Sequence, residues 1–122
     1  MKRVDGKKGE DIALEYLLKR GFVLRDRNWR CHHLEIDLVM EDEKYLHIVE
    51  VRSRREPYLV SPIDSVIKKK QNRIVKACSA YIKKFNILKE VSFDVVSITF
   101  FSEANRGYKV EFYERAFYPI YR

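Results

Sequence analysis

Cysteine, proline and glycine are scarce in this sequence, and long hydrophobic runs are absent. It holds two cysteines, three prolines and four glycines among 122 residues. Cys31 and Cys78 are too few for a disulfide framework, so we expect reduced thiols and a cytoplasmic location. No apolar run approaches the roughly 18 residues of a membrane span, and the charged N-terminal residues are unlike a signal peptide. Without internal repeats or a low-complexity linker, the sequence predicts one domain over residues 1–122, with no membrane contact.

The excess positive charge of +7 is concentrated in the middle of the chain. Residues 1–51 carry ten basic and eleven acidic side chains, residues 52–89 carry eleven and two, and residues 90–122 carry four and five. The central segment therefore has a net charge of +9, whereas each flanking segment has −1. Such a basic block attracts a polyanion such as a nucleic acid, although a solvated basic helix is the plainer alternative.

The spacing of apolar residues predicts an α/β fold. Period-two stretches indicate strands, and stretches with a 3.6-residue period indicate helices. In chain order we expect a helix at 6–19, a short strand beginning at 22–24 before a polar stretch, strands at 34–40 and 45–52, a helix at 62–85, and strands at 92–101 and 108–113. A helix between two strands favours a parallel crossover, which gives a mixed β-sheet flanked by helices, in the order α-β-β-β-α-β-β. The aromatic stretch 116–121 would pack on the core or form a partner surface.

A charged pair, Glu50 and Arg52, interrupts the otherwise hydrophobic strand at 45–52. Burying a charged side chain is costly unless it meets an opposite charge or holds a metal ion. One interpretation is a buried ion pair with a structural role alone. The other is a site of chemistry, and the pair is the strongest functional signal in the sequence.

The turn between the second and third strands predicts which side chains share a face. A turn centred between positions 42 and 43 places Asp37 opposite Ile48, on the same side as Glu35 and Glu50. Arg52 projects from that side as well, because it follows Glu50 by two residues. Carboxylates brought together repel each other, and a divalent cation relieves the repulsion. Carboxylates with a backbone carbonyl and waters suit Mg²⁺ or Mn²⁺.

Other charged residues are expected close to this strand. Glu10 lies within the apolar arc of the first helix, as a third carboxylate for the site or as an acid favoured by the helix dipole. Lys70 lies on the apolar stripe of the second helix, from which it could snorkel or reach a phosphate. The candidate phosphate contacts all carry positive charge and follow the charged strand closely; they are Arg54, Arg55, Lys68, Lys69, Lys70, Arg73 and Lys76.

Histidines are the remaining candidates for metal binding. His32 and His33 follow Cys31, but this spacing matches no closed zinc set. They are interpreted as loop residues near the acidic strand, where they could contact phosphate. His47 alternates with apolar residues and is expected to be a packed core histidine.

Taken together, an acid in the first helix, Glu35-Ile36-Asp37 on one strand and Glu50-Val51-Arg52 on the next resemble the PD-(D/E)XK nuclease superfamily. That superfamily includes Holliday-junction resolvases and many restriction enzymes. The chain is more closely similar to the YraN family of uncharacterised bacterial endonuclease-like proteins, over most of its length. The matching segments are Gly9-Glu10, Tyr16-Leu17, Arg27-Asn28, Glu35-Ile36-Asp37, Val49-Glu50-Val51, Lys70 with Arg73-Ile74, and Phe93-Asp94-Val95-Val96.

The resemblance implies a restriction-endonuclease-like fold and Mg²⁺- or Mn²⁺-dependent hydrolysis of phosphodiester bonds in DNA, including branched DNA. It implies that Asp37, Glu50 and the backbone carbonyl of Val51 bind the metal. Glu10 would complete the acidic cluster directly or through water. Arg52 occupies the fourth catalytic position of the motif.

Two residues depart from the family pattern. Arg52 stands where the motif has lysine, and Leu34 stands where glycine usually precedes the Glu-Ile-Asp segment. Arginine stays charged and cannot deprotonate water, although it can stabilise charge on a phosphate. Three hypotheses therefore stand: a metal-dependent endonuclease, a nucleic-acid-binding module on the nuclease scaffold without catalysis, and a purely structural domain. A resolvase that cuts two strands symmetrically would also require a homodimer.

Overall fold

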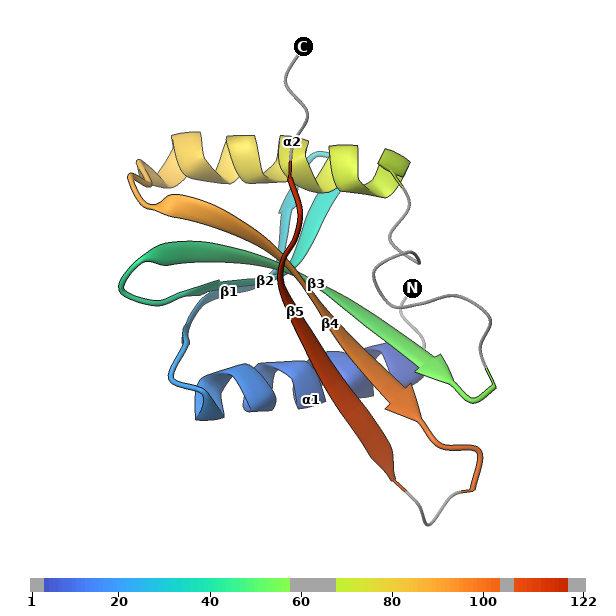
Figure 1. Cartoon of the computed structure of the whole chain (residues 1–122). Helices are drawn as coiled ribbons and strands as arrows, with labels where there is room; N and C mark the ends of the chain where they lie inside the picture. The colour runs from blue at the N-terminus through green and yellow to red at the C-terminus, as the bar shows by residue number, and fades with distance from the viewer. Residues whose placement is uncertain (1–3, 58–67, 104–106, 119–122) are drawn as a thin grey trace.

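In the computed structural model, a five-stranded sheet lies between two helices (Figure 1). The structure describes residues 4–57, 68–103 and 107–118. The elements are α1 (Val4–Lys19), β1 (Val23–Cys31), β2 (Leu34–Glu41), β3 (Tyr45–Arg55), α2 (Lys68–Phe85), β4 (Glu90–Phe100) and β5 (Tyr108–Phe117). This order confirms the predicted α-β-β-β-α-β-β arrangement.

The strands lie side by side in sequence order, β1-β2-β3-β4-β5. Three of the four neighbouring pairs are antiparallel, and β3 with β4 is parallel. Helix α2 makes the connection between these two parallel strands, as the crossover rule requires. The predicted mixed sheet is therefore confirmed.

Each face of the sheet has its own hydrophobic core. Helix α2 covers one face, where Ile74 and Tyr81 pack with Ile48 of β3. Helix α1 covers the other face, where Leu17 packs with Val49 and with residues of β4. Figure 1 shows the two helices on opposite sides of the sheet. Alternation along β3 therefore sends even-numbered side chains toward α2 and odd-numbered side chains toward α1.

A glycine sets the approach of α1 to the sheet. Gly9 is buried against β3, and a methyl group at this position would overlap the hydroxyl of Ser53. The missing side chain lets the helix lie directly on the strand. The next residue, Glu10, is thereby held in the interior at 3 % exposure.

Strand β1 is longer than the sequence predicts. It continues through the polar stretch to Cys31 because it pairs with β2 along its length, with an irregularity between Leu24 and Asp26. An edge strand can carry polar side chains on its open face, so the hydrophobic pattern underestimated its length. One of its large side chains, Trp29, meets the ring of Tyr81 edge to face, with ring centroids 5.1 Å apart.

The C-terminal strand is also longer than expected, and part of the aromatic stretch joins the core. Phe117 is buried and stacks on Phe93, with ring centroids 5.3 Å apart. Tyr118 is exposed. The rest of that stretch, and the predicted start of the second helix at Pro62, lie outside the described residues.

Both cysteines are free thiols, and burial raises the pKa of Cys78 to about 12. None of the helices among the described residues is long and apolar enough to cross a membrane.

Candidate functional site

The candidate site lies where β2 and β3 stop pairing. Paired residues run from Glu41 with Leu46 to Leu38 with Val49. The predicted register is wrong by two residues, because Ile48 pairs with Val39 rather than with Asp37. A shift of two residues preserves the parity of the pairing, so Val39 and Ile48 share the α2 side of the sheet.

The turn explains the shifted register. The Asp42 carboxylate accepts hydrogen bonds from the backbone amides of Lys44 and Tyr45, at 2.9 and 2.7 Å. The Asp42 amide donates to the carbonyl oxygen of Tyr45 at 3.1 Å. These bonds centre the turn between residues 43 and 44 instead of between 42 and 43.

Asp37 sits just past the last pair, at an irregularity in β2. Ile36 and Val39 belong to the α2-side core, whereas Leu38 belongs to the α1-side core, so simple alternation fails around Asp37. The Asp37 carboxylate accepts a hydrogen bond from the backbone amide of Val51, with a distance of 2.9 Å. A side chain therefore takes the place of a backbone partner for β3 at this point.

Glu50 is the centre of the cluster. Its side chain is 5 % exposed and lies within hydrogen-bonding reach of Asp37. Lys70 Nζ from α2 is 2.6 Å from Glu50 Oε2, and Arg52 Nη1 is 3.9 Å from the same oxygen. The structure thus brings together two carboxylates from neighbouring strands, a lysine from the covering helix and the arginine of the sequence motif.

These surroundings disfavour the ionised form of Glu50. Burial raises the pKa of this carboxyl most, the negative charge of Asp37 and a hydrogen bond with it raise it further, and Lys70 lowers it. The net result is a pKa of about 8. One ammonium group therefore does not compensate for two carboxylates in a buried place, and an additional positive charge would be favoured there.

Glu10, the third predicted acid, is held by other residues. Its Oε1 is 3.5 Å from Arg27 Nε, and the same guanidinium contacts Asp11 at 2.7 Å. Within the described ranges, no three His, Cys, Asp or Glu side chains form a group that could hold a metal ion. Metal binding by Asp37, Glu50, Val51 and Glu10 stays a prediction.

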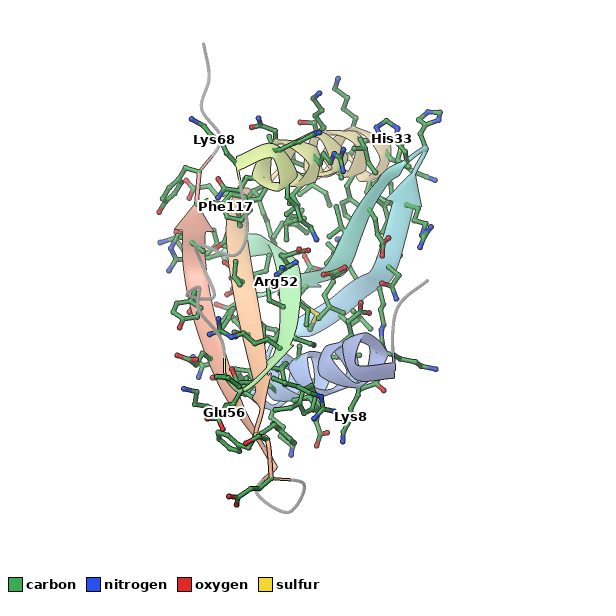
Figure 2. The ribbon with its side chains drawn as sticks, turned by 90° about the vertical axis from the view of Figure 1, so that its right-hand side faces the viewer. Lys8, His33, Arg52, Glu56, Lys68 and Phe117 are labelled. Atoms are coloured by element: carbon green, nitrogen blue, oxygen red, sulfur yellow. The ribbon has the colours of Figure 1, made fainter. Side chains whose placement is uncertain are left out.

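The predicted phosphate contacts fall into two places. Helix α2 carries seven basic residues and no acidic one, and Lys68, Lys69, Arg73 and Lys76 are exposed on it. Arg54 Nε contacts Thr99 Oγ1 at 3.5 Å, on the α2 side of the sheet. Arg55 alternates to the α1 side and lies over the Phe100 ring. Figure 2 shows Arg52 between the two helices, with Lys68 at the start of α2.

Sequence reasoning missed the contact between Lys70 and Glu50. The signal was present, since a lysine on an apolar helical stripe and an acid inside an apolar strand both need a partner. Their helix and strand are separated in sequence, so only the packing of α2 across β3 shows that they meet.

A second buried polar cluster surrounds His47, which is a packed core histidine as predicted. Its Nδ1 is 2.6 Å from Asp94 Oδ2, and its Nε2 is 3.0 Å from Asp42 Oδ2. Burial lowers the pKa of His47, but the hydrogen bonds with both aspartates outweigh it and the net pKa is raised. Burial likewise opposes ionisation of Asp42, yet amide hydrogen bonds and His47 lower its pKa to about 2.

The other two histidines lie in the turn between β1 and β2. His32 and His33 are exposed there, and His32 adopts a positive φ of 56°. The predicted loop placement is therefore confirmed, whereas a phosphate contact stays a prediction.

The fold and this cluster define a mixed α/β protein in which a buried glutamate, Glu50, meets the half-buried Asp37 beneath a basic helix. The sequence profile described as "Uncharacterised protein family UPF0102" matches residues 9–98. A UPF0102 protein of Parabacteroides distasonis is 41% identical over 113 residues, covering 93% of this chain and 91% of the relative. A UPF0102 protein of Dictyoglomus turgidum is 40% identical over 94 residues, covering 76% and 80%. The chain belongs to the UPF0102 family, which confirms the resemblance to the YraN family.

Proposed function

We propose that this protein is a metal-dependent endonuclease that hydrolyses phosphodiester bonds in DNA, including branched DNA. The observation that carries the proposal is the meeting of Asp37 and Glu50, with Lys70 Nζ 2.6 Å from Glu50 Oε2. Strongly perturbed carboxyl groups beside a specific charged partner are typical of functional sites.

The donor set suits Mg²⁺ or Mn²⁺. Asp37 and Glu50 would bind the ion with the backbone carbonyl of Val51, and waters would complete its shell, as is usual for Mg²⁺. The raised pKa of Glu50 supports this assignment, because the pair favours additional positive charge. When bound, the metal would lower the pKa of a coordinated water and stabilise charge on the phosphate.

Lys70 supplies the amine that Arg52 does not. Lysine can orient or deprotonate an attacking water, whereas arginine stays protonated. The amine of Lys70 reaches Glu50 from α2, and the guanidinium of Arg52 lies further away at 3.9 Å. We assign Lys70 to the attacking water and Arg52 to electrostatic stabilisation of the phosphate.

The exposed basic residues of α2 would hold the nucleic acid beside this site. Neutralising backbone phosphates releases counterions, so affinity should fall steeply as salt rises. Binding that stays constant between low and high salt would contradict this role for α2.

The second candidate is a nucleic-acid-binding module that does not cleave. Arg52 in place of the motif lysine favours it, as does the existing ion pair of Glu50 with Lys70. Cleavage of branched and linear DNA with Mn²⁺, Mg²⁺ or EDTA separates the two candidates. Wild-type binding without cleavage under every metal condition would select the binding module.

Three variants test the assignment of roles. Asp37→Asn and Lys70→Met should each lower cleavage about 100-fold or more, as expected for loss of a charge-stabilising or proton-transferring group. Lys76→Met is the matched control, because Lys76 is an exposed basic residue of the same helix. It should weaken binding modestly and leave the turnover of bound DNA unchanged. Cleavage that survives Asp37→Asn would exclude this site.

The Arg52→Lys variant tests whether Lys70 on α2 is sufficient to serve the attacking water. If Lys70 serves the attacking water, Arg52→Lys gains little activity and Lys70→Met remains inactive in that background. Restored cleavage in the Arg52→Lys, Lys70→Met double variant would instead show that the residue at position 52 serves the attacking water. Symmetric cutting of two strands would further require a homodimer, which analytical ultracentrifugation with and without DNA can detect.

A further inference from the structure

A pocket lies at the far end of the sheet from α2 (Figure 2). The pocket has a volume of about 200 Å³, and its lining residues come from α1, the ends of β3 and β4, and the start of β5. They are Lys8, Arg55, Phe100, Phe101, Gly107 and Tyr108. Figure 2 shows Lys8 and Glu56 toward this end of the molecule, beyond Arg52.

The lining combines positive charge with aromatic rings. Lys8 Nζ and Arg55 Cζ each lie 5.5 Å from the centroid of the Phe100 ring. Phe100 is buried, so its ring forms the base on which both cations rest. Tyr108 meets Phe100 edge to face at 6.2 Å and is 48% exposed, which leaves ring surface open for stacking. No acidic side chain belongs to the described lining.

This chemistry matches one unit of a nucleic acid. Lysine binds phosphate as a point charge, arginine donates paired hydrogen bonds to it, and aromatic rings stack on bases of any sequence. The pocket is smaller than the roughly 300–1,000 Å³ that holds a drug-sized ligand. It therefore suits a single planar base with its phosphate.

Strand β3 joins the pocket to the carboxylate cluster. Arg55 follows Glu50 by five residues, which corresponds to about 16 Å along a strand. Over this stretch, the described residues of β3 pair with β4 only, so the other edge of β3 is not covered by β2. The pocket lies on the α1 side of the sheet and Glu50 on the α2 side, so a nucleic acid that reaches both would pass around this edge of β3.

We propose that this pocket binds one nucleotide of a single strand, with its base on Tyr108 and its phosphate between Lys8 and Arg55. The proposal rests on the proposed function only in taking a nucleic acid as the ligand. It requires no cleavage, so binding assays without metal test it separately. A protein that binds through this pocket would prefer DNA with a single-stranded arm or flap.

The test is anisotropy of a short fluorescein-labelled single-stranded oligonucleotide in EDTA, with the full chain. Tyr108→Ala should weaken binding about 5- to 150-fold, the range expected for loss of one base–aromatic stack. Tyr108→Phe keeps the ring and should bind within about twofold of the wild type. The matched control is Tyr118→Ala, which removes an exposed tyrosine that does not line the pocket and should have no effect.

The cations are tested through the salt dependence of the same binding. Lys8→Gln and Arg55→Gln should each reduce the slope of log K against log salt by about 1. Circular dichroism confirms that each variant is folded. If Tyr108→Ala binds the oligonucleotide with unchanged affinity, or if the wild type does not bind it, the proposal that this pocket binds a nucleotide is wrong. If Tyr108→Ala weakens binding while no metal supports cleavage, the proposed nuclease activity is wrong and the proposed nucleotide binding by the pocket is supported.

Discussion

Replacing Glu50 by glutamine should stabilise the metal-free protein at alkaline pH. The pKa of Glu50 is raised from 4.5 to about 8, so the folded protein retains a proton there that the unfolded chain has lost. Stability associated with this group is present below pH 4.5 and is lost as the pH rises toward 8. Glutamine has nearly the same shape and never ionises, so the variant escapes this loss.

The size of the effect follows from the same values. One pKa unit corresponds to roughly 1.4 kcal/mol, so the difference between 4.5 and about 8 corresponds to about 5 kcal/mol. This is an upper bound, because Lys70 loses its partner in the variant. The Lys70 side chain is 44% exposed and can be hydrated instead, which limits that loss. We therefore expect a gain of about 2–5 kcal/mol above pH 8.

Urea denaturation followed by circular dichroism, in EDTA and across this pH range, measures the effect. The free energies of unfolding of wild type and Glu50→Gln should converge at acid pH and diverge as the pH rises. Glu15→Gln is the control, since Glu15 is exposed and pairs only with Lys19 four residues away within the part of the chain described. Its difference from the wild type should be small across the whole range.

Added Mn²⁺ provides the second arm of this experiment. If Glu50 binds the ion, Mn²⁺ should stabilise the wild type, by about 2.7 kcal/mol at one hundred times its dissociation constant, and leave Glu50→Gln almost unchanged. Destabilisation of Glu50→Gln at every pH would refute the electrostatic account of this cluster. Equal stabilisation of both proteins by Mn²⁺ would refute the metal assignment.

Three further predictions concern the fold around the site. Gly9→Ala should destabilise the protein by about 1–3 kcal/mol through overlap with Ser53, and Ser53→Ala in that background should recover part of the loss, measured by urea denaturation. His47→Gln should lower the free energy of unfolding by about 3 kcal/mol near pH 6. The difference in stability between this variant and the wild type should narrow as the pH rises through the raised pKa of His47, because the stabilisation by protonated His47 is complete only below pH 6.5. Thermal melts at several pH values check this. Tyr81→Phe should cost about 1–2 kcal/mol in urea denaturation, because its hydroxyl accepts from Arg25 Nε at 3.0 Å and donates to Asp26 Oδ2 at 2.6 Å. A variant with the same free energy of unfolding as the wild type would contradict the stabilising role of the corresponding contact.

The hairpin and the crossover were predictable because their hydrophobic patterns are strong. The strands at 34–40 and 45–52 alternate clearly, and the second helix has a continuous apolar stripe. The polar strand β1 was underestimated, since its length depends on pairing with β2 and not on its own side chains. The predicted pairing of β2 with β3 was displaced by two residues because the Asp42 carboxylate accepts hydrogen bonds from the amides of Lys44 and Tyr45. These bonds move the centre of the turn, and the spacing of apolar residues does not reveal them.

The candidate site was predictable in part for a different reason. A register displaced by two residues keeps the parity of the pairing, and Asp37 meets Glu50 although alternation in β2 is interrupted beside it. The position of Lys70 over Glu50 depends on how α2 crosses the sheet, which the sequence pattern does not determine. Glu10 was expected near the pair from its helical phase alone, and its contact with Arg27 of β1 needed the full course of that strand.

Two acids inside apolar strands show how a structural charge differs from a candidate functional one. Asp94 is fully buried, yet it receives hydrogen bonds from Ser92, from the backbone amide of Arg115 and from His47. Glu50 is almost as buried, but it adjoins another carboxylate, Lys70 offsets this only in part, and its pKa rises to about 8. A fully satisfied acid rigidifies the core, whereas an acid that burial and a like charge oppose costs stability in the absence of a cation. That contrast supports Glu50, and not Asp94, as the residue to test for metal binding first.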